Sequence, residues 1–182
     1  KAAIRYLVKE QPATPSVKPA TIEKLKNETL APMKLYEENK GVTTQPEINP
    51  NYIVPKQFMF RLQKLMDEYA GGVGSQFTTS AKLLDRGLEL LDFLKEDSKN
   101  LGAADHHELM RCWENIHRMY QAEAHVRTVR FREETRWPGY YFRADFPKLD
   151  QDNWLCFVNC TMDPATEKWE MHKRNIIPMF KD

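Results

Sequence analysis

Three stretches with helical periodicity, separated by short breaks, occupy residues 55–134 and limit the folds open to this chain. In each stretch apolar residues recur three or four positions apart, as on one face of an α-helix. Because the connections are short, the pattern predicts an antiparallel three-helix bundle. The apolar positions are Phe58, Leu62, Leu65 and Tyr69, then Leu84, Leu88 and Leu91, then Leu109, Trp113, Ile116, Tyr120 and Ala124.

The ends of these stretches carry residues that start and stop helices. Pro55 suits a first helical position, and the glycines from Gly71 onward supply a left-handed cap after the first helix. Thr79 or Ser80 is the predicted N-cap of the second helix. Asp105, with Glu108 three residues later, forms a capping box for the third helix, which is expected to run to about Glu134.

After Pro147 the periodicity changes from that of a helix to that of a strand. Residues 154–159 and 169–173 are rich in strand-forming residues and flank a turn at 163–168. This pattern predicts a C-terminal β-hairpin, which the segment Ile176–Pro178 could continue as an edge.

Residues 1–54 have the pattern of an extended strap rather than of a domain with its own core. A first helix is expected to stop near Gln11, and residues 21–39 predict a short helix broken at Pro32. The fold class is therefore mainly α, with an extended N-terminal strap and a C-terminal hairpin. We expect three parts: a strap at 1–54, the bundle at 55–135, and a joint plus hairpin at 136–182. A chain that opens within a helix indicates a piece of a longer polypeptide.

Composition excludes several classes of protein. The chain has 27 Lys and Arg against 26 Asp and Glu, a net charge of +1, which gives no overall attraction to nucleic acid or to acidic membranes. No apolar run approaches the ~20 residues of a membrane span. Three cysteines are an odd count for a disulfide framework, so a reducing, cytoplasmic location is expected.

The segment Glu133–Pro147 places charged residues among aromatic rings. Charges in such surroundings are costly to bury unless each finds a partner. We therefore expect the segment to be held in one conformation against its own domain or a neighbouring one. The predicted structural and docking residues are Arg136, Trp137, Tyr140, Arg143 and Asp145.

The same segment has two alternative interpretations. Arginines interleaved with aromatic rings can bind nucleic acid, and a single anion site at Arg136 or Arg143 also fits, because guanidinium suits sulfate and phosphate. Acidic residues nearby favour ion pairing instead. Two pairs with helical spacing are predicted, Glu123 with Arg127 and Arg130 with Glu134.

Metal and catalytic signals are weak. His107 and Glu108 resemble a zinc-protease helix, but Arg111 stands where the second histidine would be needed. Cys156 and Cys160 fall on one face of a strand without further ligands at finger spacing. Because no phosphate loop, dinucleotide motif or nucleophile elbow is present, we assign no catalytic, cofactor-binding or metal-ligating residue.

Several longer motifs resemble a known family. Glu134-Thr-Arg136, followed by Arg143-Ala-Asp-Phe-Pro147, is similar to the E-S-R-G-x-H and R-x-D-(F/Y)-P motifs that end the long helix of succinate dehydrogenase/fumarate reductase flavoproteins. Asp150, Asp152 and Trp154 resemble its D-D-x-x-W segment. The motif G-x-H is replaced here by WPGYY at 137–141, which is similar to the adenylylsulfate reductase branch of the family.

Further stretches in the same order support that branch. PKQFMFRLQKLMDEYAGG, HELMRCWENIHR and DNWLCFVN resemble its C-terminal region, and KAAIRYL resembles the helix after its last FAD-contacting glycine segment. The resemblance implies an oxidoreductase that interconverts adenylylsulfate with sulfite and AMP. It also implies FAD in the parent subunit, an FAD-binding domain in the same polypeptide and an iron–sulfur beta subunit as partners. No residue here matches the family's catalytic motifs, so the fragment alone is expected to be inactive.

Two other functions remain open on the sequence. One is the C-terminal domain of another fumarate reductase-like flavoprotein. The absence of the G-x-H motif argues against this alternative. The other is a non-catalytic helical scaffold that docks protein or RNA, for which salt-dependent RNA binding would be the signature.

Overall fold

The computed structural model describes residues 1–10, 17–42, 49–136, 141–163 and 166–177. The chain forms two compact units, Lys1–Ala31 and Pro32–Asp182. The first unit holds helix α1 (Ala2–Glu10) and the start of helix α2 (Pro19–Asn39), and α2 continues into the second unit. The predicted end of the first helix near Gln11 lies outside the described residues, and the apolar side chains of α1 are exposed.

Helix α2 continues through Pro32, so the predicted break at this residue is wrong. Proline removes one backbone hydrogen bond from a helix interior. Here Pro32 is buried, and its carbonyl oxygen accepts a hydrogen bond of 2.9 Å from the Ala103 amide. These contacts with the second unit's own residues offset the missing bond, and the helix persists.

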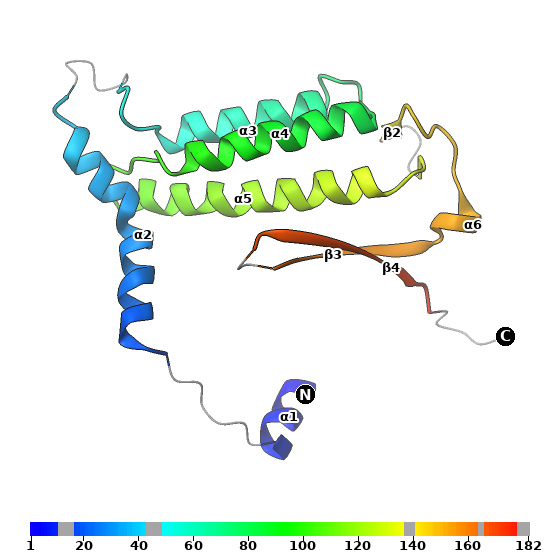
Figure 1. Cartoon of the computed structure of the whole chain (residues 1–182), viewed down its shortest axis with the longest axis horizontal. Coiled ribbons are helices and arrows are strands. Elements are labelled where there is room, and N and C mark those ends of the chain that lie inside the picture. Colours follow the sequence, from blue (N-terminus) through cyan, green and yellow to red (C-terminus); the bar gives the residue numbers. More distant parts are fainter. Residues whose placement is uncertain (11–16, 43–48, 137–140, 164–165, 178–182) are drawn as a thin grey trace. The chain divides into compact units, whose positions relative to one another are not determined.

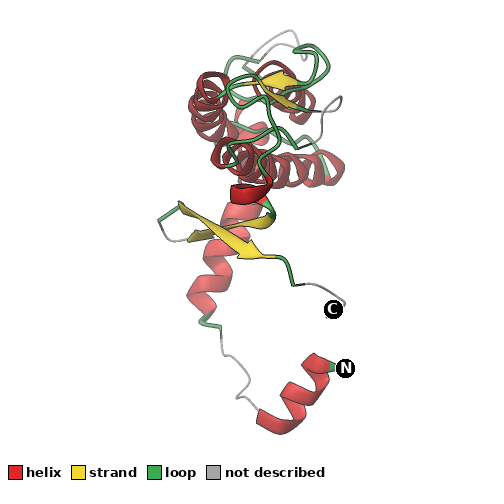
Figure 2. Cartoon of the chain, turned by 90° about the vertical axis from the view of Figure 1, so that its right-hand side faces the viewer, coloured by secondary structure: helices red, strands yellow, loops and turns green. Residues whose placement is uncertain are grey.

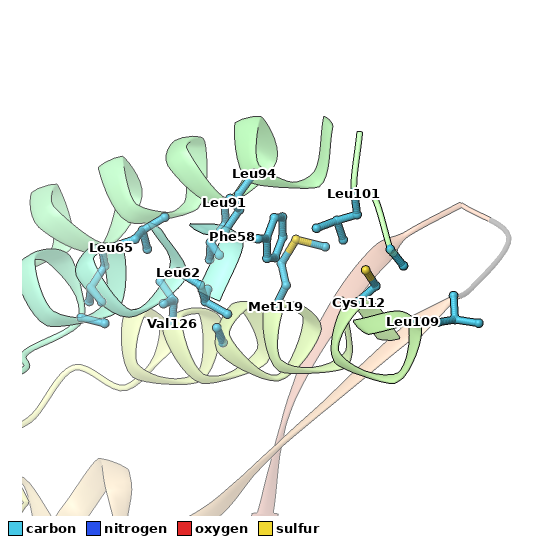
Figure 3. Close-up of a cluster of buried hydrophobic side chains, with 14 residues drawn as sticks. Phe58, Leu62, Leu65, Leu91, Leu94, Leu101, Leu109, Cys112, Met119 and Val126 are labelled. Atoms are coloured by element: carbon cyan, nitrogen blue, oxygen red, sulfur yellow. The ribbon is translucent and has the colours of Figure 1, made fainter. Parts of the chain in front are cut away.

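The second unit is built on three antiparallel helices that lie side by side (Figure 1). They are α3 (Pro55–Tyr69), α4 (Ala81–Ser98) and α5 (His106–Phe131). Figure 3 shows Phe58, Leu91 and Met119, one from each helix, pointing into a shared core. The predicted mainly α fold with a three-helix bundle is confirmed. Other buried members of the core are Leu62, Leu65, Leu84, Leu94, Leu101, Leu109, Cys112 and Val126.

Most predicted helix signals act as expected. Pro55 begins α3, and Gly71 follows that helix with a positive φ of 81°. Ser80, rather than Thr79, is the N-cap of α4. Asp105 caps α5 by accepting a 2.8 Å hydrogen bond from the Glu108 amide. The predicted end of α5 near Glu134 is wrong, because the helix stops at Phe131.

A hairpin of strands β3 (Cys156–Asp163) and β4 (Lys168–Asn175) follows the short helix α6 (Gln151–Trp154). The hairpin is confirmed, and β3 packs beside α5 as a layer apart from the helices (Figures 1 and 2). Cys156 and Cys160 share its half-buried face, as the strand period predicts. Ile176 and Ile177 are not part of a strand, so the predicted edge is wrong for them, and Pro178 lies outside the described residues.

Two further short strands, β1 (Thr78–Thr79) and β2 (Phe142–Arg143), pair in parallel. The register sets Thr79 opposite Arg143. The amides of Phe142 and Ala144 donate hydrogen bonds of 2.8 Å to the carbonyls of Phe77 and Thr79. This pairing fixes the segment after α5 against the entrance to α4. Within the described ranges, no helix has the length and hydropathy that crossing a membrane requires.

Candidate functional site

Arg143 closes the C-terminal end of α5. Its side chain is only 1% exposed, and Nη1 donates to the carbonyls of Val129 and, at 2.7 Å, of Arg132. The last carbonyls of a helix lack partners within the helix and carry partial negative charge. A buried guanidinium therefore satisfies these acceptors and has a favourable electrostatic position.

Asp145 connects the same arginine to the start of α4. Its carboxylate receives two hydrogen bonds from Arg143, 2.9 Å from Nε and 2.8 Å from Nη2. Its Oδ2 also accepts a 2.8 Å hydrogen bond from the amide of Ala81, the first residue of α4. An anion is favourable at a helix N-terminus, so one ion pair joins the ends of two neighbouring helices.

Glu134 is the centre of a second ionic group, between α5 and the hairpin. Its side chain is fully buried and accepts hydrogen bonds from Arg132, from Arg136 and, at 3.0 Å, from the Asp150 amide. Burial alone would raise the pKa of this carboxyl. The hydrogen bonds from Arg136, Asp150 and Arg132 outweigh that effect and lower the pKa.

The two arginines around Glu134 also hold the hairpin. Arg132 and Arg136 each donate a 2.9 Å hydrogen bond to the carbonyl of Trp154, and Arg132 donates another of 2.8 Å to that of Cys156. The entry into β3 is thus bound to the exit from α5. We call Arg132, Glu134, Arg136, Arg143 and Asp145 the arginine joint.

Neighbouring residues complete the packing around the joint. The buried Thr135 accepts a 3.0 Å hydrogen bond from the Arg143 amide and donates one of 2.8 Å to the Phe146 carbonyl. The Tyr141 hydroxyl donates to the Ala70 carbonyl at 2.8 Å, and burial raises its pKa to about 12. A Cβ on Gly71 would lie 2.6 Å from the Tyr141 ring, so this close approach requires glycine.

The structure confirms one of the two predicted ion pairs and contradicts the other. Arg127 and Glu123 pair at 2.8 Å as predicted. Arg130 and Glu134 do not pair, because α5 ends before Glu134 and helical spacing no longer applies. Arg130 instead binds Asp85 of α4 at 2.7 Å.

The predicted docking residues are partly brought together. Arg143 and Asp145 form one ion pair, and Arg136 joins the other ionic group through Glu134. Trp137 and Tyr140 lie outside the described residues. The roles of Arg132 and Glu134 were not predicted, although the arginines and glutamates at 132–136 suit ion pairing within an extended segment.

The arrangement does not favour the anion site considered from the sequence. A cavity of about 290 Å³ adjoins the joint and is lined in part by Arg132, Arg136 and Arg143. However, the nitrogens of Arg143 and Arg136 are engaged by the carboxylates, carbonyls and Gln151 side chain described for the joint. A phosphate or sulfate would have to displace these partners.

The weak metal signals gain no support. Among the residues that the structure describes, no group of three or more His, Cys, Asp or Glu side chains could hold a metal ion. The three cysteines are free, and burial raises the pKa of Cys112 to about 12, which keeps that thiol protonated.

The ion pair of the joint is expected to make the free energy of unfolding fall at acidic pH. The hydrogen bonds from Arg143 lower the pKa of Asp145 from 3.8 to about 2. Because the folded-state pKa is depressed, the ionised carboxylate stabilises the fold above about pH 4, and this contribution disappears as the pH falls toward about 2. We expect a loss of roughly 1–2 kcal/mol, allowing for solvent screening at this partly exposed group.

Urea unfolding between about pH 5 and pH 2.5 measures this effect. Asp145→Asn removes the titrating group and should flatten the decline, leaving the contributions of Glu134 and Asp150, whose pKa values are lowered in the same direction. Equal slopes for the variant and the unchanged chain would contradict the assignment.

Comparison with known proteins places this geometry in a family. Residues 60–180 match the family model described as fumarate reductase flavoprotein C-term. The alpha subunit of adenylylsulfate reductase from Megalodesulfovibrio gigas is 50% identical over 161 residues, which cover 87% of this chain and 24% of that protein.

Solved structures agree with the sequence comparison. Adenylylsulfate reductase from Archaeoglobus fulgidus has a TM-score of 0.94 and 46% identity, covering 99% of this chain and 28% of the other. The same values hold for adenosine-5-phosphosulfate reductase in a covalent adduct with sulfite. E. coli quinol fumarate reductase has the same fold at 17% identity, with a TM-score of 0.65 over 92% of this chain and 27% of the other.

The chain spans about a quarter of the length of these relatives. The family model covers most of α3, all of α4 and α5, the arginine joint and the hairpin. On this evidence, the chain belongs to the fumarate reductase flavoprotein C-terminal family.

Proposed function

We propose that this chain is the C-terminal helical domain of the FAD-containing alpha subunit of an adenylylsulfate reductase. The parent enzyme would be a flavin-dependent oxidoreductase of sulfur metabolism that interconverts adenylylsulfate with sulfite and AMP. The observation that carries the proposal is a TM-score of 0.94 at 46% identity over 99% of the chain. The WPGYY sequence at 137–141, where the wider family has G-x-H, favours this branch over other members.

The role of the domain within that subunit would be structural. The arginine joint binds the end of α5 to the start of α4 and to the hairpin, so it gives the bundle one fixed outer surface. We infer that residues 55–135 and 136–182 brace the FAD-binding part of the same polypeptide, with residues 1–54 as the connecting strap. Arg136, Trp137, Tyr140, Arg143 and Asp145 are the proposed structural and docking residues.

The arginines of the joint do not fit FAD itself. Its diphosphate would need free cationic or backbone donors, and the arginines of the joint are engaged by Glu134, Asp145 and backbone carbonyls. FAD would therefore be bound by the rest of the parent subunit. The proposed partner is a beta subunit with iron–sulfur clusters, and three free cysteines suit a reducing compartment such as the cytoplasm.

The test uses the full-length parent subunit produced together with its beta subunit. The complex should contain FAD and should oxidise sulfite in the presence of AMP, forming adenylylsulfate while an added electron acceptor takes up two electrons. The 182-residue chain alone should show neither flavin absorbance nor this activity. A flavin-containing complex that reduces fumarate but does not use sulfite and AMP would favour the alternative that the chain belongs to another fumarate reductase-like flavoprotein. Stoichiometric FAD on the isolated chain would contradict the structural role.

A further inference from the structure

The hairpin carries three sulfur-containing side chains at neighbouring positions on one face. Side chains alternate between half-buried and exposed along β3, and Cys160 and Met162 belong to the half-buried set. On β4 the half-buried residues are Trp169 and Met171. The register sets Cys160 directly opposite Met171 and Met162 opposite Trp169, so one thiol has a thioether beside it on its own strand and another across the hairpin.

Strand geometry brings these three sulfur atoms within reach of a single ion. The Cβ atoms of directly opposed residues such as Cys160 and Met171 lie about 4.5–5.5 Å apart. Met162 is about 6.7 Å from Cys160 along β3 and about 7–8 Å from Met171 on the diagonal. Because a methionine side chain has three rotatable bonds, each thioether can be directed toward the Cys160 thiol without movement of the backbone.

The nitrogen and oxygen ligands of β4 lie on the opposite face. Glu170 and His172 occupy exposed positions of this strand. There the His172 imidazole lies 3.3 Å from the Thr161 hydroxyl and 3.8 Å from the Glu170 carboxylate. The half-buried face of the two strands therefore offers a thiol and two thioethers without a carboxylate or an imidazole. A thiolate combined with thioethers suits a soft metal ion, of which Cu(I) is the clearest example.

Helix α5 lies beside the half-buried face. The Arg127 guanidinium of this helix is 5.9 Å from the centre of the Trp169 ring, which fixes the direction of the face. The buried Glu123 carboxylate is bound by Arg127 at 2.8 Å and by Lys95 at 2.7 Å, so it is engaged and does not compete as a ligand. Partial burial shields the sulfur atoms from water and still leaves an ion a path to them.

We propose that Cys160, Met162 and Met171 form a three-coordinate site for a soft monovalent metal ion, and that Cu(I) is the ion that fits best. On binding, the Cys160 thiol releases its proton to solvent and coordinates as a thiolate, while the two thioethers coordinate as neutral ligands. No electron is transferred. The charges of the thiolate and of Cu(I) cancel, so the occupied site adds no net charge to the half-buried face and avoids the cost of burying an unpaired ion.

Competition with a coloured chelator tests the site in the 182-residue chain. The chain is titrated without oxygen against Cu(I) held by bicinchoninate, whose colour reports how much metal the protein removes. Cys160→Ser and Met171→Leu each remove one ligand, and leucine nearly preserves the volume of methionine. Cys156→Ser is the matched control, because Cys156 shares the half-buried face but stands opposite Asn175. Circular dichroism of every variant checks that the helices are intact.

We expect one Cu(I) per chain and an affinity that falls about tenfold or more in Cys160→Ser and in Met171→Leu, since even residues that only orient a ligand change metal affinity by such factors. Cys156→Ser should leave the affinity unchanged. X-ray absorption of the copper should show sulfur neighbours alone.

Full affinity in Met171→Leu, or an equal loss in Cys156→Ser, would show that a single thiolate takes up the metal and would overturn the proposal, as would failure to remove Cu(I) from the chelator. If Met171→Leu lowers the yield of folded protein, Met162→Leu provides the same readout. The measurement involves neither flavin nor substrate, so its outcome is separate from that of the proposed function.

Discussion

Arg143→Met is expected to lower the free energy of unfolding of this chain by about 3–5 kcal/mol, because it leaves two carbonyl groups at the end of α5 without their buried donor and Asp145 without its ion-pair partner. The substitution preserves most of the side-chain volume but removes every hydrogen bond of the guanidinium. Asp145 loses its two contacts with Arg143, and the Val129 and Arg132 carbonyls at the end of α5 lose a buried donor. The midpoint and slope of urea unfolding measure the effect.

Arg130→Met is the matched control. Arg130 also binds a carboxylate near the end of α5, but its side chain and that of Asp85 are 37% and 53% exposed. An exposed pair of this kind contributes up to about 1 kcal/mol. If both variants lost the same small amount of stability, Arg143 would be no more than a surface ion pair and the joint would lose its proposed importance.

The sequence predicted the helices well because their signals are local. Pro55, Ser80 and Asp105 begin helices through their own backbone or side-chain chemistry, and the structure uses all three as expected. The strand period likewise places Cys156 and Cys160 on one face correctly. Where a few neighbouring residues decide the conformation, the sequence is sufficient.

The errors occur where distant residues decide. Pro32 was expected to break α2, but a contact with Ala103, some seventy positions away, supports the helix there. Arg130 was paired with Glu134 from helical spacing, while Asp85 on the neighbouring helix is its actual partner. The last carbonyls of α5 accept hydrogen bonds from Arg143, which lies in the following segment. No local pattern contains that information.

The same distinction applies to the candidate site. Charges among aromatic rings correctly predicted that Arg136, Arg143 and Asp145 would need partners. The identity of those partners depended on where α5 ends, because only an extended chain after Phe131 lets Arg132 and Arg136 converge on Glu134. Glu134, at the centre of the joint, was therefore predicted to form its ion pair with Arg130 instead of with Arg132 and Arg136.

Glu134→Gln tests that central position and is expected to destabilise the chain by about 2–4 kcal/mol. Both carboxylate oxygens of Glu134 face donors, from Arg132, Arg136 and the Asp150 amide. A glutamine would direct its own NH2 group at one of these donors and would leave two guanidinium groups without a counter-charge. Glu133→Gln makes the same chemical change at an exposed neighbour and should stay within about 0.5 kcal/mol.

The place where Glu134→Gln increases local unfolding distinguishes loss of the hairpin contacts from destabilisation of the whole domain. Because Arg132 and Arg136 hold the carbonyls of Trp154 and Cys156, Glu134→Gln should release the hairpin before the bundle unfolds. Hydrogen exchange should therefore accelerate at the amides of β3 and β4 more than at those of α3 and α4. Equal acceleration in the hairpin and the bundle would show that Glu134 supports the domain as a whole, and that the hairpin is held by its other contacts.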